Sequence, residues 1–337
     1  MLSASVIVPT YNRPTALART LAALRDMDFP ADQLEIMIVD SGAPGSGAEH
    51  LARSSAARYA RFPDKGVAAA RNHGASLASG ELLLFVDDDI VVGESNLRQH
   101  QAIHMSDDAC VVGGHWEFDP ELRRHLESSP LGRFRLAYED LYNKPDGIGS
   151  GTGRGQVYPK TLAAANLSLR ADTFRALDGF DERFPVGAED QDLTWRAAKA
   201  GCVLVYDYDI RVIHNDQHSD FISLCRRHER GAIGTVYFVR KNIDAPNPPL
   251  LTVNGPVRRA DSPRVMARKL SRAVLSRRLP LALAHRLVRV AERLRPNGGW
   301  PLEFAYRAVG GLHVFRGVRE GLRLTSGDNW DRAHRAS

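Results

Sequence analysis

Residues 82–92 read LLLFVDDDIVV, in which five apolar residues run directly into Asp87, Asp88 and Asp89 before the chain turns apolar again. A run of this length bounded by charge predicts a buried parallel strand, so the three carboxylates would lie at its C-terminal end. In open α/β sheets, ligands bind at that edge. Neighbouring carboxylates repel one another unless they share a cation, and their oxygens suit Mg²⁺ or Mn²⁺. The alternative is a solvated acidic turn.

The N-terminal segment predicts a βαβ unit beside this strand. Ser5 to Pro9 is a short apolar run, and Pro14 suits the first position of a helix with leucines at helical spacing. A second apolar run, Leu34 to Val39, ends at Asp40. Such units have a right-handed crossover and parallel strands, so we expect Asp40 at the same edge as Asp87. A helix-cap or turn aspartate is the alternative for Asp40.

The next segment repeats this pattern. Tyr59 to Phe62 favours a third strand, and the Ala-rich stretch Gly66 to Ala78 favours a helix. Arg71 and Asn72 lie inside that helix, so we expect at least one of them to be a solvated surface residue. The first 113 residues therefore predict a nucleotide-binding half-sheet. They contain neither GxGxxG after the first strand nor GxxxxGK[ST], which disfavours dinucleotide-binding and P-loop enzymes.

The middle of the chain is less regular from Glu117 to Lys160. Its glycine-dense stretch, Ile148 to Tyr158, favours a mobile lid, with a plain linker as the alternative. Further on, Glu189 and Asp190 begin a predicted helix, where the helix dipole alone would favour carboxylates.

Two short edge-like strands are predicted next, at Val203 to Asp207 and Arg211 to His214. An amphipathic helix follows from Phe221 to Val239.

The composition bounds the class of protein. The 337 residues contain no run of about 18 apolar residues and no signal-peptide pattern, so we expect a cytoplasmic protein. Three scattered cysteines, Cys110, Cys202 and Cys225, form no CxxC pair. Their spacing argues against a disulfide framework and against a structural zinc site.

The net charge of +5 hides an asymmetry between the two parts of the chain. Residues 251–337 carry 18 Lys+Arg and 6 Asp+Glu, which leaves 27 and 34 for residues 1–250. Ser262 and Pro263 predict the start of a basic helix, and a second basic helix runs to Arg295. These helices favour peripheral contact with an anionic membrane or, alternatively, a cap on the acidic main domain. No aromatic residues lie between the basic ones from Arg258 to Arg295, so a nucleic-acid partner is not expected.

Several separated blocks of sequence occur together in a characteristic order. They are SVIVPTYNRP (5–14), VDSG (39–42), KGVAAARNHGASLASGELLLFVDDD (65–89), AANLSLR (164–170), ALDGFDERF (176–184) and GAEDQDLTWRAAKAG (187–201). The order resembles family 2 glycosyltransferases. The resemblance implies an α/β GT-A fold with a Rossmann-like, mostly parallel sheet over residues 1–242, divided at 113/114 into a nucleotide-binding half and an acceptor half. Residues 243–337 would then be a basic helical C-terminal region.

The resemblance also implies a nucleotide diphosphate sugar as donor, most often a UDP-sugar. By motif, the residues that would line the base, ribose and diphosphate are Pro9, Thr10, Tyr11, Arg13, Asp40, Lys65, Gly66, Arg71, Asp87 and Asp88. The family transfers the sugar to an acceptor hydroxyl with inversion. The acceptor has no motif here, and the QxxRW block and membrane spans of the processive polymerases are absent from the sequence.

The acidic triplet resembles the DXD motif of that family. This implies that Asp89 binds Mg²⁺ or Mn²⁺, with Asp87 beside it, and that His214 also reaches the metal, as a histidine does in some members. The alternative for His214 is an ordinary core or surface histidine. Asp190 resembles the catalytic base, preceded by Glu189.

The chemistry requires two acidic sites, and the sequence supplies two: one binds the metal that offsets the charge of the departing nucleoside diphosphate, and the other takes the acceptor proton. A metal-dependent sugar nucleotidyltransferase and a non-catalytic nucleotide-sugar binding module remain the alternatives.

Overall fold

The computed structural model describes residues 2–63, 66–106, 111–142, 154–156, 161–215, 220–245 and 249–326. The chain divides into two units. The first comprises Met1–Leu122, Asp140–Arg183 and Glu189–Asp216, and the second comprises Arg123–Glu139, Phe184–Ala188 and Gln217–Ser337. This division differs from a boundary at residue 242, because the helix that begins at Phe221 falls in the second unit.

A mixed sheet forms the centre of the first unit. Its strands are β1 (Ala4–Thr10), β2 (Leu34–Asp40), β3 (Arg58–Arg61), β4 (Leu82–Val86), β5 (Ile90–Val92), β6 (Val111–Phe118), β7 (Arg154–Gln156), β8 (Asn166–Arg170) and β9 (Leu204–His214). The order is β3-β2-β1-β4-β8-β6-β9-β5, with β7 also paired to β9. Strands β3, β2, β1 and β4 are parallel, as predicted, whereas β8 runs antiparallel to β4 and β6. The sheet is thus mixed rather than mostly parallel.

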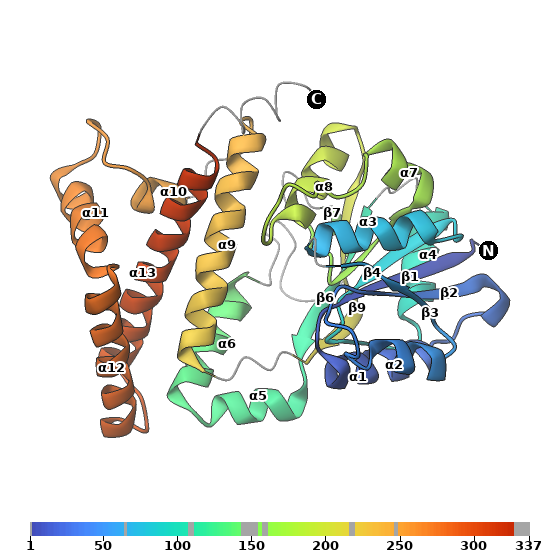
Figure 1. Ribbon diagram of the computed structural model, residues 1–337, viewed down its shortest axis with the longest axis horizontal. Helices are drawn as coiled ribbons and strands as arrows, with labels where there is room; N and C mark the ends of the chain where they lie inside the picture. Colours follow the sequence, from blue (N-terminus) through green and yellow to red (C-terminus); the bar gives the residue numbers. More distant parts are fainter. Residues whose placement is uncertain are drawn as a thin grey trace. The chain divides into compact units, whose positions relative to one another are not determined.

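Alternation along the strands places helices on both faces of this sheet (Figure 1). One face of β1 and β4, including Val6 and Leu84, packs with α1 (Pro14–Arg25), α2 (Ala48–Ser54) and α4 (Asn96–Ser106). The other face, including Ile7 and Phe85, packs with α3 (Val67–Leu77), α7 (Ala171–Ala176) and α8 (Glu189–Lys199). A fully buried strand of five apolar residues needs both layers, so the α/β prediction from residues 82–86 is confirmed.

The prediction of two short edge-like strands after residue 203 is wrong. Residues 204–214 form one strand, β9, which is paired along its length with β6 and on its other side with β7 and β5. The register with β6 shifts between Gly114 and His115. A Cβ on Gly114 would lie 2.5 Å from the carbonyl oxygen of Ile210, so glycine lets the strands approach there. The bulge interrupts the apolar alternation along β9, so the sequence pattern predicts two strands where the structure has one.

A buried polar network lies between α4 and β8. His100 Nε2 lies 2.9 Å from Asn166 Oδ1, and both His100 Nδ1 and His104 Nε2 contact the Ser168 hydroxyl at 2.8 and 2.9 Å. Burial lowers the pKa of His100 to about 4, so its imidazole is neutral.

Helices dominate the second unit. They are α9 (Phe221–Lys241), α10 (Pro249–Asn254), α11 (Pro263–Leu275), α12 (Arg278–Leu294) and α13 (Trp300–Leu324), while α5 (Pro120–Glu127) and α6 (Pro130–Tyr142) span the boundary between units. The irregular segment predicted from Glu117 therefore includes two helices, and α13 was not predicted. The predicted lid at 148–158 lies outside the described residues except for β7.

Helices α9 and α13 pack along one another (Figure 1). Small residues permit this approach, since a Cβ on Gly317 would lie 2.1 Å from the carbonyl oxygen of Glu229. At α11, the side chain of Ser262 accepts a hydrogen bond from the Val265 amide, which confirms the predicted helix start. No helix within the described residues is long and apolar enough to cross a membrane.

Candidate active site

The aspartate triplet follows β4, and hydrogen bonds to its backbone hold it from three directions. The carbonyl oxygen of Asp87 accepts from the Ile90 amide at 3.1 Å, and that of Asp89 accepts from the Asn215 amide at 2.8 Å. The carbonyl oxygen of Asp88 accepts from the hydroxyl of Thr20, a buried residue of α1, at 2.8 Å. Every carbonyl of the triplet is therefore bonded, and the three carboxylates project from a fixed turn.

Asp88 and Asp89 share one arginine. Arg13 Nη1 lies 2.8 Å from Asp88 Oδ1, and Arg13 Nη2 lies 2.6 Å from Asp89 Oδ2. The other oxygen of Asp88 accepts a hydrogen bond from the Thr10 hydroxyl at 2.7 Å. Burial raises the pKa of Asp88 to about 6, against the opposing effects of Arg13 and Thr10. Of the predicted donor residues, Thr10, Arg13 and Asp88 thus lie together.

His214 lies beside Asp89. The two are brought together because β9 ends at His214, which pairs in register with Ile90 of β5. Its Nε2 is 3.4 Å from Asp89 Oδ2, and its ring stands edge-on to that of Trp116 with centroids 5.1 Å apart. Burial would raise the pKa of Asp89, but the hydrogen bonds and charges of His214 and Arg13 hold it well below its usual range.

A carboxylate and an imidazole are suitable ligands for a divalent metal, so Asp89 and His214 could hold one. The same Asp89 oxygen faces Arg13, whose charge an incoming cation would replace. Asp87 points to a different partner, so the predicted trio of Asp87, Asp89 and His214 is not gathered within one ligand sphere. Within the described residues, the group of three potential metal ligands that does cluster is elsewhere, in the second unit.

Arg71 connects Asp87 to the second acidic site. Its Nη2 lies 2.6 Å from Asp87 Oδ1, and its Nη1 lies 2.7 Å from Glu189 Oε1. The Arg71 side chain is 4% exposed and its guanidinium lies over the ring of Phe180, 5.3 Å from the centroid. Nearby carboxylates raise its pKa although burial opposes this. Both Nη groups pair with carboxylates, so Arg71 is placed to position Asp87 and Glu189.

The expectation that Arg71 or Asn72 is a solvated surface residue is therefore wrong. Arg71 is buried, and Asn72 exchanges hydrogen bonds with the backbone of Phe180 at 2.8 and 2.9 Å. Both side chains point from α3 toward the segment before α8, a long-range contact that helical periodicity does not reveal.

Asp190 lies in the first turn of α8, next to Glu189, as predicted. Its two carboxylate oxygens accept hydrogen bonds from the Ala164 amide at 3.2 Å and from the Gln191 amide at 2.8 Å. Burial and the neighbouring Glu189 carboxylate raise the pKa of Asp190 to about 7, against the opposing charge of Arg71. A carboxylate with such a pKa can take a proton near neutral pH.

Asp40 lies at the end of β2, at the predicted edge, but its oxygens are engaged locally. One accepts from the Gly42 amide at 2.7 Å, and the other from the hydroxyls of Ser46 at 2.7 Å and Tyr59 at 3.1 Å. This arrangement is typical of a turn aspartate, the alternative considered for Asp40. Ser46 and Tyr59 had no motif that would have connected them with it.

The other predicted donor residues border this edge. Pro9 is buried at the end of β1, and Tyr11 is 52% exposed just beyond it. Gly66 precedes α3 with a φ of +88°, a conformation that favours glycine. Lys65 lies outside the described residues.

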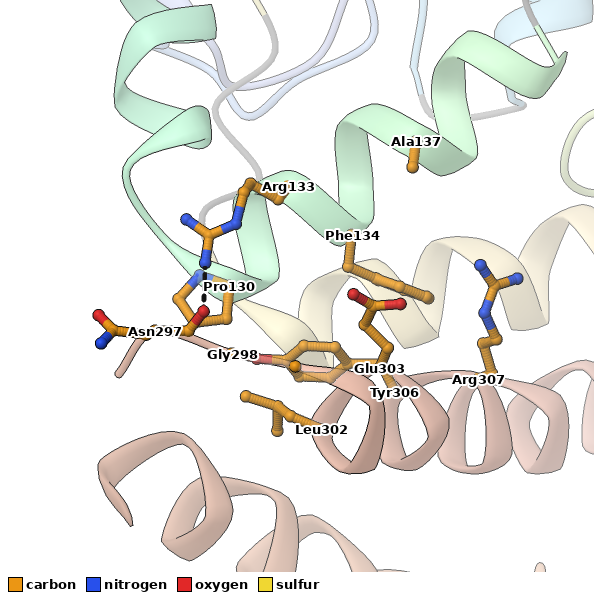
Figure 2. Close-up of a pocket in the computed structure, with 11 residues that line it drawn as sticks. Pro130, Arg133, Phe134, Ala137, Asn297, Gly298, Leu302, Glu303, Tyr306 and Arg307 are labelled. Carbon is orange, nitrogen blue, oxygen red and sulfur yellow. Dashed lines mark hydrogen bonds between the residues drawn. The ribbon is translucent and has the colours of Figure 1, made fainter. Parts of the chain in front are cut away.

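A cavity of about 340 Å³ lies in the second unit (Figure 2). Its walls come from α6 and the start of α13, and Arg133 donates a hydrogen bond across it to the carbonyl oxygen of Asn297 at 2.9 Å. The residues that line it include none of the predicted site residues.

Comparison with known proteins gives consistent matches. The model of glycosyl transferase family 2 matches residues 5–158. A validoxylamine A glucosyltransferase of Streptomyces hygroscopicus subsp. jinggangensis is 29% identical over 244 residues, covering 65% of this chain and 57% of that protein. Glycosyltransferase AglE of Haloferax volcanii is 26% identical over 216 residues, covering 62% and 66%. The chain thus spans less than two thirds of these relatives' lengths.

Two solved structures share the fold. The mannosyltransferase PcManGT of Pyrobaculum calidifontis, in complex with GDP-Man and Mn²⁺, matches 98% of this chain and 88% of its own with a TM-score of 0.56 and 18% identity. TarS 1–349 of S. aureus, in complex with UDP-GlcNAc, matches 97% and 93% with a TM-score of 0.51 and 18% identity. At this identity the likeness concerns the fold, and the predicted GT-A fold is confirmed.

Proposed function

Because the model of glycosyl transferase family 2 matches residues 5–158, we propose that this chain transfers a sugar from a nucleotide diphosphate sugar to an acceptor hydroxyl with inversion. The observation that carries the proposal is the division of the acidic residues into two sites. Asp89 and His214 form one, and Asp190 with its raised pKa forms the other. Arg71 joins the two through Asp87 and Glu189.

In this proposal Asp89 and His214 hold the divalent ion, Mg²⁺ or Mn²⁺, which when bound offsets charge on the diphosphate. Arg13 pairs with the same Asp89 oxygen, so its guanidinium lies next to the proposed ion site. Thr10, Tyr11 and Pro9 border the base and ribose. The base is proposed to be uracil as the commonest in the family, although the structural neighbours include both a GDP-mannose and a UDP-GlcNAc complex.

Asp190 is proposed as the general base that removes the acceptor proton. A base works best when its pKa lies near the working pH, and the pKa of Asp190 is raised to about 7. Glu189 assists indirectly, since its negative charge keeps the pKa of Asp190 high while Arg71 limits the effect. Asp87 and Glu189 hold Arg71, and Arg71 in turn fixes the distance between the two acidic sites.

The test is an incubation with UDP-, GDP- and dTDP-sugars and Mn²⁺ that follows release of nucleoside diphosphate. We expect metal-dependent release, slowed about 10²-fold or more in Asp190→Asn with unchanged donor affinity by calorimetry. Asp172→Asn is the matched control, because Asp172 is an exposed carboxylate in the first turn of α7. Pyrophosphate release from a nucleoside triphosphate and sugar phosphate would favour a nucleotidyltransferase, and donor binding without turnover a binding module.

We also propose that α12 contacts an anionic membrane surface. A stripe of apolar side chains on this helix is exposed, with Leu279 at 84%, Leu283 at 57%, Leu287 at 60% and Leu294 at 76%. Exposed arginines accompany the stripe at Arg278, Arg286, Arg289 and Arg293. Apolar burial in the headgroup region combined with arginine charge would bind acidic lipid and weaken as salt rises.

Co-sedimentation with phosphatidylserine vesicles at low salt tests this contact. Binding should fall in Leu279→Ser/Leu283→Ser and remain in Leu77→Ser, which changes a partly exposed leucine of α3. Surface variants are preferable to truncation after Asn242, since removing α13 would strip α9 of its packing. Equal binding to neutral vesicles, or binding unaffected by the leucine changes, would contradict the contact. A membrane-bound protein would favour a lipid-linked acceptor.

A further inference from the structure

Three potential metal ligands meet in the second unit, outside the site described above. Cys225 comes from α9, His285 from α12 and His313 from α13. One ligand atom of each lies within 4.8 Å of the other two. Cys225 and His313 are buried, and Cys225 belongs to the apolar cluster that includes Phe221 and Tyr306. Burying a polar group without a partner costs free energy, and a bound ion would satisfy one polar atom of each of the three side chains.

The two imidazoles face each other through their Nε2 atoms at 3.0 Å. Two nitrogen ligands at about 2.0–2.1 Å from a tetrahedral zinc ion would lie about 3.3 Å apart, so a small outward movement would admit the ion. Their rings are nearly parallel, with an interplanar angle of 16° and centroids 5.1 Å apart.

The partner of the other ring nitrogen of His313, Nδ1, supports the same arrangement. His313 Nδ1 lies 2.6 Å from Glu229 Oε2, and Arg316 lies 3.3 Å from the other oxygen of that carboxylate. Histidines that bind metals usually donate the N–H of their other nitrogen to a carboxylate, a backbone carbonyl or a water, which fixes the ring and strengthens the ligand. A Cys225 thiolate and Glu229 would also supply two negative charges to balance a divalent cation.

We propose that Cys225 Sγ, His285 Nε2 and His313 Nε2 bind a transition-metal ion of the zinc class. The ion links α9, α12 and α13, and Glu229 orients His313. Binding converts the Cys225 thiol to a thiolate and releases its proton to solvent. The site ties α12 to α9 and α13. This link adds to the packing of α12, whose buried residues are Leu281 and Val288. The spacing of the cysteines in the sequence argues against a zinc site. It does not reveal that His285 of α12 and His313 of α13 lie beside Cys225.

The same atoms have a metal-free arrangement. His285 Nε2–H can donate to His313 Nε2 while His313 Nδ1–H donates to Glu229, which satisfies both nitrogens of His313 and the Nε2 of His285. Burial raises the pKa of the Cys225 thiol to about 12, so in this state the thiol stays protonated. A hydrogen-bonded histidine pair is therefore the competing outcome of the test.

The experiment uses the untagged full chain, so that no added histidines bind metal. Elemental analysis after desalting should give about one zinc per chain, and added Co²⁺ should produce a thiolate-to-metal charge-transfer band. A Cys110→Ser/Cys202→Ser protein retains Cys225 as its single cysteine, so its band can come only from Cys225. Cys225→Ser and His285→Ala should lose the band, whereas Asp89→Asn should keep it, which separates this site from the proposed catalytic one.

Stability gives a second readout. Zinc that binds only the folded chain should lower the unfolding equilibrium constant about 100-fold when free zinc is 100 times its dissociation constant. A chelator should reverse this effect. Absence of the band and of zinc-dependent stabilisation in the single-cysteine protein would overturn the proposal and leave the histidine pair. Metal retained equally in Cys225→Ser and His285→Ala would place the ion elsewhere and also overturn it.

Discussion

Replacing Arg71 with methionine tests whether its buried ion pairs hold the two acidic sites together. The substitution keeps much of the side-chain length but leaves Glu189, which is 5% exposed, without its cation. Removing one partner of a buried pair typically costs about 3–5 kcal/mol, because the remaining charge stays desolvated. We therefore expect Arg71→Met to lower the free energy of unfolding in urea by about that amount at pH 8.

The pH dependence distinguishes an electrostatic loss from a packing loss. The charge of Arg71 lowers the pKa of Asp190. Without Arg71 the pKa of Asp190 should rise further above its unfolded value, so the folded protein binds more protons than the unfolded chain in that range. Stability of the variant should then fall as pH rises, and its deficit should shrink at pH 5. Arg53→Met is the control, because the Arg53–Glu49 pair on α2 is exposed and should contribute about 0.5 kcal/mol or less. A deficit below about 1 kcal/mol, equal at pH 5 and pH 8, would refute the role assigned to Arg71.

Three further outcomes are expected. Nucleoside diphosphate release should fall about tenfold per pH unit below about 7, since Asp190 must be ionised to act as base; a flat profile from pH 5 to 8 would exclude it. The pKa of His100 is lowered to about 4 in the folded protein from 6.5, so the unfolded chain takes up the proton first as pH falls between these values. About 3 kcal/mol of stability should be lost over this range. His100→Gln should reduce that loss, which urea unfolding measures. Gly317→Ala should lower the melting temperature by overpacking α9 against α13, at a cost of about 1–3 kcal/mol, while Gly93→Ala, which has open space around it, should not.

The sequence was most informative where a single local signal determined the element. The buried run 82–86, the proline at residue 14 and the Ser262 cap each specify a strand or a helix start from neighbouring residues, and all three are confirmed. The family resemblance also named Asp89 and His214 as candidate metal ligands and Asp190 as the candidate catalytic base. Their roles remain proposals, but the fold does bring Asp89 and His214 together.

Long-range features were not accessible in the same way. The bulge opposite Gly114 made β9 look like two strands, because the register is decided by a partner strand far along the chain. Arg71 looked like a surface residue because helical spacing cannot reveal carboxylates contributed by other elements. The same limit hid Thr20, whose hydroxyl meets a carbonyl 68 residues away.

That bond of Thr20 has a consequence for how ligand affinity arises. Fixing the backbone of one residue costs about 1–2 kcal/mol, and the three residues of the aspartate turn are already fixed through their carbonyls when the chain folds. The entropy cost of ordering the turn is therefore met when the chain folds and not when a ligand binds. A substitution at Thr20, which touches neither donor nor acceptor, would leave the turn less ordered. Ligand binding would then have to meet part of that entropy cost. Affinity in this site is thus partly encoded in helix α1, through a residue that bonds the backbone of the turn and not its carboxylates.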